Sequence, residues 1–248
     1  MSKIPNVIHF CWFGGKPLPP FALKCIESWK KYFPSYEIKK WDESNFDVNA
    51  IPYVREAYSL KKFAFVSDYA RFWILFNYGG LYFDTDVEIV KDMNHIIENG
   101  PFMGCEFDCS DESGIAVSPG LGLGAVPKMQ IYGQILDLYK TLHFVDDKGA
   151  VNYTTVVAYV TNLLKKNELR NVPGIQQVGD VKIYPKEFFC PMNSKGKMDC
   201  FSRNTVAIHH FSATWKPKST KMKELVQRMV GKKITKMVVR IKTFVREF

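Results

Sequence analysis

The sequence predicts an α/β fold, and three segments near its beginning carry this prediction. The apolar run at 6–13 ends at a glycine pair and indicates a buried strand. Residues 21–33 have the three- and four-residue spacing of a helix, which stops at Pro34. A second strand follows at 36–41. This order favours parallel pairing of the strands, and ligands of such sheets bind beyond the carboxyl ends of the strands.

The later elements extend the same pattern. A helix is expected at 67–80, where Ser67 or Asp68 can cap its start and Gly79-Gly80 its end. A strand interrupted by an acidic pair follows at 81–90. Because no repeat or low-complexity linker separates these elements, we expect one domain at 1–216 and an appendage at 217–248. The remaining expected elements are a helix at 150–167 and strands at 181–185 and 205–211.

The positive charge of the chain lies at one end. The net charge is +9, and residues 216–248 hold 11 of the 34 Lys and Arg but only 2 of the 25 Asp and Glu. The preceding residues are therefore neutral overall, which argues against nucleic acid as a partner of the body. We expect no nucleic-acid binding.

The compartment is predicted from what the sequence lacks. The six cysteines form no C-x-x-C pair, no signal-peptide pattern stands at the amino terminus, and no apolar run has the length of a membrane span. We therefore expect reduced thiols in a cytoplasmic protein that is not integral to a membrane.

The acidic pair Asp84 and Asp86 ends the apolar run "LYF". In an extended chain, residues two apart point to the same side, so both carboxylates are predicted to project together while Thr85 faces away. Carboxylates this close repel one another unless a proton, an arginine or a cation neutralises them. Their hard oxygens suit Mg²⁺ or Mn²⁺.

Two classes of enzyme place D-x-D at the end of a strand. In phosphatases of the haloacid-dehalogenase type the signature continues D-x-D-x-[TV], whereas the fifth residue here is Glu88. In sugar transferases of the GT-A type the pair holds a metal on the diphosphate of a nucleotide sugar. A module that binds carbohydrate or membrane without catalysis is a third alternative.

Four separated motifs resemble one family. "FVSDYARFWILFNYGGLYFDTDVEIV", "IPNVIHFCWFGGKPLP" with "SWKKYFPSYEIKKWDESNFD", "IYPKEFFCP" and "AIHHFSATW" occur in its order. The chain resembles, over about residues 4–216, the DXD-motif glycosyltransferases that include capsular polysaccharide synthesis proteins, fungal initiating mannosyltransferases and, remotely, the large glucosylating toxins. The resemblance implies a GT-A fold, in which helices flank a Rossmann-like mixed sheet that binds the nucleotide sugar.

The resemblance also implies roles for residues before the pair. Trp12 would stack on the nucleobase, and Ser67, Asp68 and Arg71 would contact the donor sugar and phosphate. The spacing supports part of this, since residues three apart on a helix share a face. Tyr82 lies two residues before Asp84 and is expected to line the donor site. Asp86 would be the closer metal ligand.

A loop near the other end would close over the diphosphate. The segment "HHFSATWKP" offers His209 and His210, which alternate faces, so one of them is expected to face the metal; we favour His210. Ser212, Trp215 and Lys216 would cover the phosphates. The toxins use an acidic ligand in this loop, which this chain lacks. The glycine-rich segment 119–127 lacks a phosphate-loop lysine and is expected to be a close-packed turn.

Together these observations predict a retaining glycosyltransferase that needs Mn²⁺ or Mg²⁺. Retention is implied by the resemblance. The expected donor is a nucleotide sugar, with a UDP-sugar favoured. The expected acceptor is a lipid-linked glycan in bacterial capsular or surface polysaccharide synthesis. The donor sugar, its base, the acceptor linkage and the oligomeric state do not follow from these residues.

The appendage has the pattern of a basic amphipathic helix. From Met222 to Phe248 apolar residues recur at steps of three and four, and Lys and Arg occupy most other positions. Such a helix is suited to an anionic bilayer surface, so residues 217–248 are expected to hold the protein peripherally at the inner face of the cell membrane. Packing of the stripe on protein is the alternative.

Overall fold

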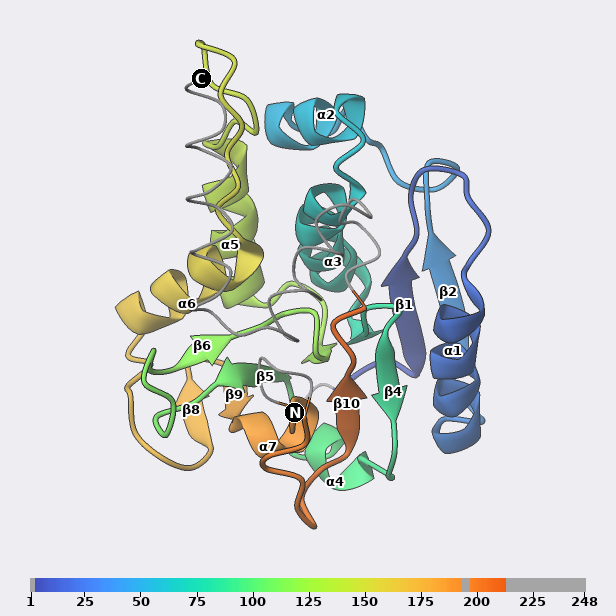
Figure 1. Ribbon diagram of the computed structural model, residues 1–248, viewed down its shortest axis with the longest axis vertical. Helices are drawn as coiled ribbons and strands as arrows, with labels where there is room; N and C mark the ends of the chain where they lie inside the picture. The colour runs from blue at the N-terminus through green and yellow to red at the C-terminus, as the bar shows by residue number, and fades with distance from the viewer. Residues whose placement is uncertain (1–2, 193–196, 213–248) are drawn as a thin grey trace, which may run out of the picture. The chain divides into compact units, whose positions relative to one another are not determined.

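The computed structural model describes residues 3–192 and 197–212 (Figure 1). Contacts group Met1–Phe211 into one compact unit. The predicted domain boundary at 216/217 and the helix predicted beyond it lie outside the described residues, so both stay predictions.

A mixed sheet forms the centre of this unit. Strands β1, β2, β3, β5 and β9 run in the same direction, while β7 runs antiparallel between β3 and β5. The carboxyl ends of the five parallel strands therefore meet at one edge. Among the described residues the strand order is β2 (Glu37–Trp41), β1 (Val7–Cys11), β3 (Gly80–Tyr82), β7 (Leu123–Ala125), β5 (Phe102–Phe107), β9 (Val181–Tyr184) and β8 (Gln176–Val178), with β6 (Ala116–Val117) paired to β5.

Helices cover both faces of the sheet, and each face has its own apolar core. One core contains residues of α2 (Pro52–Ser59), α3 (Phe63–Tyr78), α5 (Gln130–Lys140) and α6 (Val156–Lys166). The other contains residues of α1 (Pro20–Tyr32), α4 (Asn94–Ile97) and α7 (Lys186–Phe189). The predicted α/β class, a mixed sheet flanked by helices, is confirmed.

A two-stranded ribbon lies on the second core. Strand β4 (Val87–Ile89) pairs antiparallel with β10 (Ala207–His209), and the two run side by side in Figure 1. The Trp29 indole of α1 donates a hydrogen bond to the Val87 carbonyl (2.8 Å). Helix α1 and the second core therefore fix the ribbon, which brings residue 209 beside residue 87.

The first predicted elements agree with the structure to within two residues, but two helix starts were predicted wrongly. Helix α3 begins at Phe63 rather than near Ser67, because Phe65 and Val66 are buried and extend the helix at its start. Ser67 is inside the helix, where its hydroxyl donates to the Phe63 carbonyl (3.1 Å). Helix α6 begins at Val156, after a cap by Thr155.

A buried histidine fixes the turn into β3. The His9 Nε2 atom lies 3.0 Å from the Gly79 carbonyl oxygen, and the Trp41 indole donates to His9 Nδ1 (3.0 Å). These two bonds make Nε2 the protonated nitrogen of a neutral ring. Burial lowers the pKa of His9 to about 4, so the ring stays neutral near pH 7.

Candidate active site

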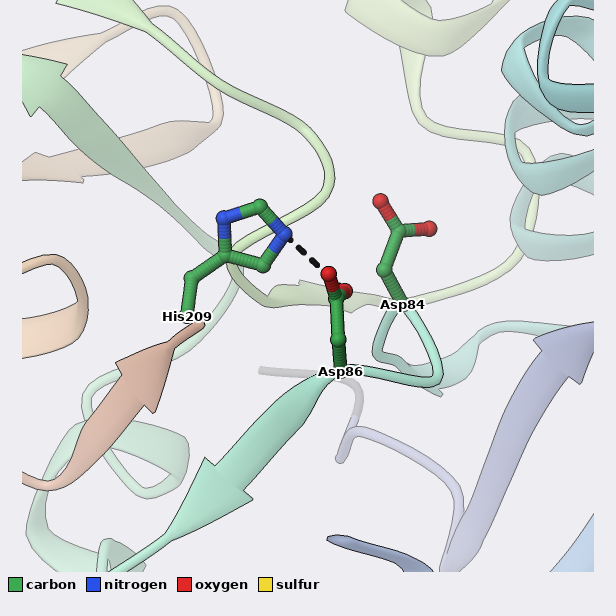
Figure 2. Close-up of side chains that lie close together, drawn as sticks. All are labelled: Asp84, Asp86 and His209. Atoms are coloured by element: carbon green, nitrogen blue, oxygen red, sulfur yellow. Dashed lines mark ion pairs between the residues drawn. The ribbon is translucent and has the colours of Figure 1, made fainter. Parts of the chain in front are cut away.

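The acidic pair lies in a turn between two sheets. The Val87 amide donates to the Asp84 carbonyl (3.0 Å), which closes a turn over 84–87 between β3 and β4. The extended geometry predicted for the pair is therefore wrong, because the chain leaves the main sheet at this point. The turn still places both carboxylates toward the same space (Figure 2).

Arg71 neutralises the first of these carboxylates. Its Nη2 atom lies 3.3 Å from Asp84 Oδ1, and its Nη1 donates to Asp84 Oδ2 (3.4 Å). The same guanidinium pairs with Asp68 Oδ1 at 2.8 Å, which confirms that Asp68 and Arg71 share a helix face. Arg71 is 3% exposed. Its side chain therefore holds Asp84 from the side of the core.

Opposing effects set the ionisation of Arg71 and of its partner Asp68. Burial would lower the pKa of Arg71, but Asp84, Tyr82 and Asp68 raise it above the ordinary value, so the guanidinium is charged. Burial raises the pKa of Asp68 to about 7, against the effect of Arg71. The positive charge beside Asp84 is permanent, and it reduces the repulsion between Asp84 and Asp86.

Two further residues fix the position of Asp84. The Tyr82 hydroxyl donates to Asp84 Oδ1 (3.2 Å), and the Asp84 amide donates to the Gly120 carbonyl (3.2 Å). A methyl group at Gly120 would collide with Asp84 Oδ2. The glycine-rich segment is thus close-packed as predicted, although Leu123–Ala125 within it forms β7. Tyr82 is buried and helps to position Asp84, and its expected place in the donor site stays a prediction.

His209 is the residue from the other end of the chain that faces the pair. Its Nε2 atom lies 3.1 Å from Asp86 Oδ1 (Figure 2). Burial would lower the pKa of His209, but the hydrogen bond to Asp86 and the charges of Asp84 and Glu106 outweigh burial and raise it. The His209 Nδ1 atom is buried and has no hydrogen-bond partner among the described residues.

The preference for His210 is corrected by this geometry. Successive side chains alternate faces as the chain leaves β10, so when His209 faces Asp86 the next residue faces away. His210 Nε2 instead lies 2.8 Å from Glu88 Oε2, and its ring packs edge-on against Phe21. The sequence correctly predicted that His209 and His210 face opposite sides. It did not show which of them faces Asp86, because it does not contain the register between β10 and β4.

Asp84, Asp86 and His209 form a cluster that fits a divalent cation. One ligand atom from each lies within 4.8 Å of the others. Octahedral ligands about 2.1 Å from an ion lie roughly 3 to 4 Å apart, so small adjustments suffice. The two carboxylates suit Mn²⁺ or Mg²⁺, while the imidazole nitrogen favours the transition metal Mn²⁺ over Mg²⁺.

The other predicted residues lie around this cluster or outside the described chain. Trp12 follows β1 at the same carboxyl edge as Asp84, is partly exposed, and donates from its indole to the Lys16 carbonyl (2.6 Å). Ser212 is half-buried. Trp215 and Lys216 lie outside the described residues. Their roles and those of Ser67 and Asp68 toward a donor stay predictions.

Sequence reasoning missed Glu106. This residue lies near the carboxyl end of β5, where burial raises its pKa while His209 and a hydrogen bond with Ser118 lower it. Ser118 precedes the segment that contacts Asp84 through Gly120. A lone glutamate in the apolar strand "FMGCEF" was the available signal, because a charged residue in a buried strand needs a partner.

The comparisons with known proteins agree with the motifs. Residues 19–103 match the family described as "Glycosyltransferase sugar-binding region containing DXD motif". The chain is 28% identical over 114 residues to inositol phosphoceramide mannosyltransferase 1 of Schizosaccharomyces pombe, a match that covers 42% of this chain and 34% of the relative. The chain thus matches about a third of the length of that relative.

Solved structures of glycosyltransferases are also similar. PaToxG glycosyltransferase has a TM-score of 0.48 at 18% identity, with 66% of this chain and 69% of the other covered. The galactosyltransferase LgtC, in complex with donor and acceptor sugar analogues, has a TM-score of 0.46 at 14% identity, with 86% and 91% covered. The resemblance to DXD-motif glycosyltransferases is confirmed by the family match, which spans both Arg71 and the acidic pair.

Proposed function

We propose that this protein is a metal-dependent, retaining glycosyltransferase of the GT-A type. It transfers one sugar from a nucleotide sugar, with a UDP-sugar favoured, to a hydroxyl of a glycan acceptor. The acceptor is lipid-linked and belongs to bacterial capsular or surface polysaccharide synthesis. The family match favours this function over the phosphatase alternative.

One observation carries the proposal. Asp84 and Asp86, which belong to the matched segment, converge with His209 from more than a hundred residues away. The three side chains lie where the parallel strand β3 ends, and ligands of α/β sheets bind beyond such strand ends. A cluster of this kind is not needed to stabilise the sheet, and its proximity to charged Arg71 suits a diphosphate.

The cluster would hold a divalent cation that neutralises the leaving diphosphate. Arg71 would keep Asp84 in place and add positive charge beneath the site. Trp12 would stack on the base, and Lys216 would approach the diphosphate. In retaining transfer the bond from the anomeric carbon to the diphosphate breaks, and the acceptor oxygen bonds to the same face. The acceptor proton passes to the departing phosphate oxygen, so no separate base is required.

A screen of donors tests this proposal. UDP- and GDP-sugars are incubated with the full chain and Mn²⁺, and release of the nucleotide is measured with and without EDTA. We expect hydrolysis of one donor class that EDTA abolishes. Hydrolysis of small phosphate esters instead would identify a phosphatase, and donor binding without turnover would identify a binding module.

Association with the membrane is a separate part of the proposal. In the part of the chain that the structure describes, none of the helices combines the length and apolar character needed to cross a bilayer. The basic stripe at 217–248 would instead place the enzyme at the cytoplasmic face of the membrane, where a lipid-linked acceptor is exposed.

Sedimentation with liposomes tests this association. We expect the full chain to sediment with anionic liposomes and to be released by high salt, while a chain ending at Lys218 stays in solution and keeps donor hydrolysis. Equal sedimentation of both chains, or none of either at low salt, would contradict a membrane role and favour a tail that packs on protein.

A further inference from the structure

Two segments that follow neighbouring strands meet at the carboxyl edge of the sheet. Strands β1 and β2 are parallel and lie side by side, so the chain leaves both of them at the same edge (Figure 1). The loop 12–16 follows β1 and includes Trp12. The turn 41–46 ends β2 and has the sequence "WDESNF", to which the proposed function assigns no role.

Three consecutive residues of the loop 12–16 are held by the turn 41–46. The contacts are a hydrogen bond from the Trp12 amide to the Trp41 carbonyl (2.8 Å), edge-on packing of Phe13 against Phe46 (5.7 Å between ring centroids), and a hydrogen bond from the Gly14 amide to Glu43 Oε1 (2.7 Å). The indole of Trp12 is fixed as well, because its Nε1 donates to the Lys16 carbonyl (2.6 Å). These contacts define the position of the loop without a ligand.

Glu43 also connects the loop to two helices. The Tyr58 hydroxyl of α2 donates to the same Oε1 atom (3.1 Å), and the Tyr58 ring lies 5.6 Å from the ring of Phe63, the first residue of α3. A methyl group at Gly14 would collide with the Phe63 ring, and Gly14 has a φ of +93°. Both facts favour glycine at this position. Glu43 and Phe63 thus hold Gly14 from two sides.

The turn 41–46 is stabilised by its own polar side chains. Asp42 Oδ1 accepts hydrogen bonds from the Ser44 amide (2.9 Å) and the Ser44 hydroxyl (2.5 Å), and Asn45 Oδ1 accepts from the Asp42 amide (2.9 Å). The residues on both sides of Glu43 are therefore fixed. Glu43 itself is exposed, so we expect its hydrogen bonds to add little to the stability of the core. Their effect is on the position of the loop.

We propose that Glu43 is a positioning residue for the base of the donor. It holds the loop 12–16 in the conformation in which Trp12 stacks on the nucleobase, and it acts through Gly14 without contacting the donor. The inference rests on the proposed function, which assigns the base to Trp12. Because the loop is ordered before the donor binds, less conformational entropy is lost on binding. Loss of Glu43 therefore weakens the binding of a nucleotide but not that of a diphosphate without a base.

Calorimetry of the full chain tests this role. The probes are UDP or GDP, whichever binds, and inorganic pyrophosphate, each with Mn²⁺. Glu43→Ala should raise the Kd for the nucleotide about three- to tenfold, as expected when one hydrogen bond that orders the loop is lost. It should leave the Kd for pyrophosphate unchanged. Glu43→Gln keeps an oxygen acceptor and should stay within about twofold of the wild type for both probes.

Two further variants separate the position of the loop from general effects. Glu37→Ala removes an exposed glutamate at the other end of β2 and should change neither Kd. In a Trp12→Ala background, Glu43→Ala should cause no further loss of nucleotide affinity, because residues that act through one contact are not additive. Equal losses for nucleotide and pyrophosphate in Glu43→Ala, a wild-type Kd for the nucleotide, or additive losses in the double variant would overturn the assignment.

Failure of the proposed function has a different signature. If the wild-type chain binds neither UDP nor GDP, the donor assignment fails, and hydrogen exchange of the Gly14 amide then tests the loop by itself. Loss of protection in Glu43→Ala, with wild-type protection in Glu43→Gln and Glu37→Ala, would support Glu43 as the residue that holds the loop. Equal protection in all four proteins would overturn it.

Discussion

The two carboxylates of the acidic pair are held in different ways. Asp84 is fixed by the main sheet and α3, through Arg71, Tyr82 and the backbone of Gly120. Asp86 lies at the start of the two-stranded ribbon and forms an ion pair with His209 of β10. One carboxylate is anchored by residues within a segment of about fifty positions, the other by a strand from the far end of the domain.

The residues that hold the two carboxylates differ in what they contribute to the site. Around Asp84 the buried guanidinium provides a permanent positive charge, which costs desolvation and is retained only because two carboxylates surround it. Around Asp86 the imidazole offers a nitrogen that can serve as a cation ligand. We infer that Arg71, beside Asp84, sets the electrostatics of the site. His209, beside Asp86, completes the set of ligands for a cation.

The largest effect is expected from a substitution of Asp86. Asp86→Asn should lower donor turnover by three orders of magnitude or more, because losing a metal ligand at a leaving diphosphate costs about 4 kcal/mol or more of barrier. Turnover is measured with Mn²⁺, and circular dichroism checks the fold. Asp92→Asn changes an exposed aspartate nearby and should keep full turnover. Near-normal turnover of Asp86→Asn, insensitive to EDTA, would show that no metal acts here.

Removing the buried positive charge of Arg71 tests how Asp84 is held in place. Arg71→Met should lower the free energy of unfolding by about 3–5 kcal/mol, because Asp68 loses its partner in a buried position. Urea unfolding measures this change. Arg55→Met, at an exposed position of α2, should change it by less than about 0.5 kcal/mol. If both variants were equally stable, Arg71 would not be the anchor of Asp84.

The two adjacent histidines sharpen the comparison. His209→Gln should weaken Mn²⁺ binding about 10- to 100-fold, since an imidazole near the cluster is replaced by a poorer ligand. His210→Gln should leave Mn²⁺ affinity close to that of the wild type, because His210 faces Glu88. Calorimetric titration of both variants measures the difference. The reverse order of the two affinities would restore the original preference for His210.

The smallest effect is expected at Trp12, which is predicted to stack on the nucleobase of the donor. Trp12→Ala should weaken nucleotide-sugar binding by about 1–3 kcal/mol through the loss of stacking. Trp73→Ala removes a half-buried indole that packs against Trp41 and Phe46, so it should lower stability without changing donor affinity. Calorimetry with the nucleotide diphosphate gives both values. Unchanged affinity in Trp12→Ala would assign Trp12 to the apolar core alone.

The sequence by itself determined the features that depend on neighbours along the chain. The strand, helix and strand at the start, the shared face of Asp68 and Arg71, and the closeness of Asp84 and Asp86 all follow from local spacing. The motifs also indicated the resemblance to DXD-motif glycosyltransferases, because they are short and local.

Only the tertiary structure decided the features that depend on burial and on distant strands. Helix α3 starts at Phe63 because its early apolar residues are buried in the core, which spacing alone does not show. His209 rather than His210 faces the pair because the β4–β10 register aligns His209 with Val87. The register between these two strands, which are 120 positions apart in the sequence, depends on tertiary packing, and the sequence of neither strand contains it.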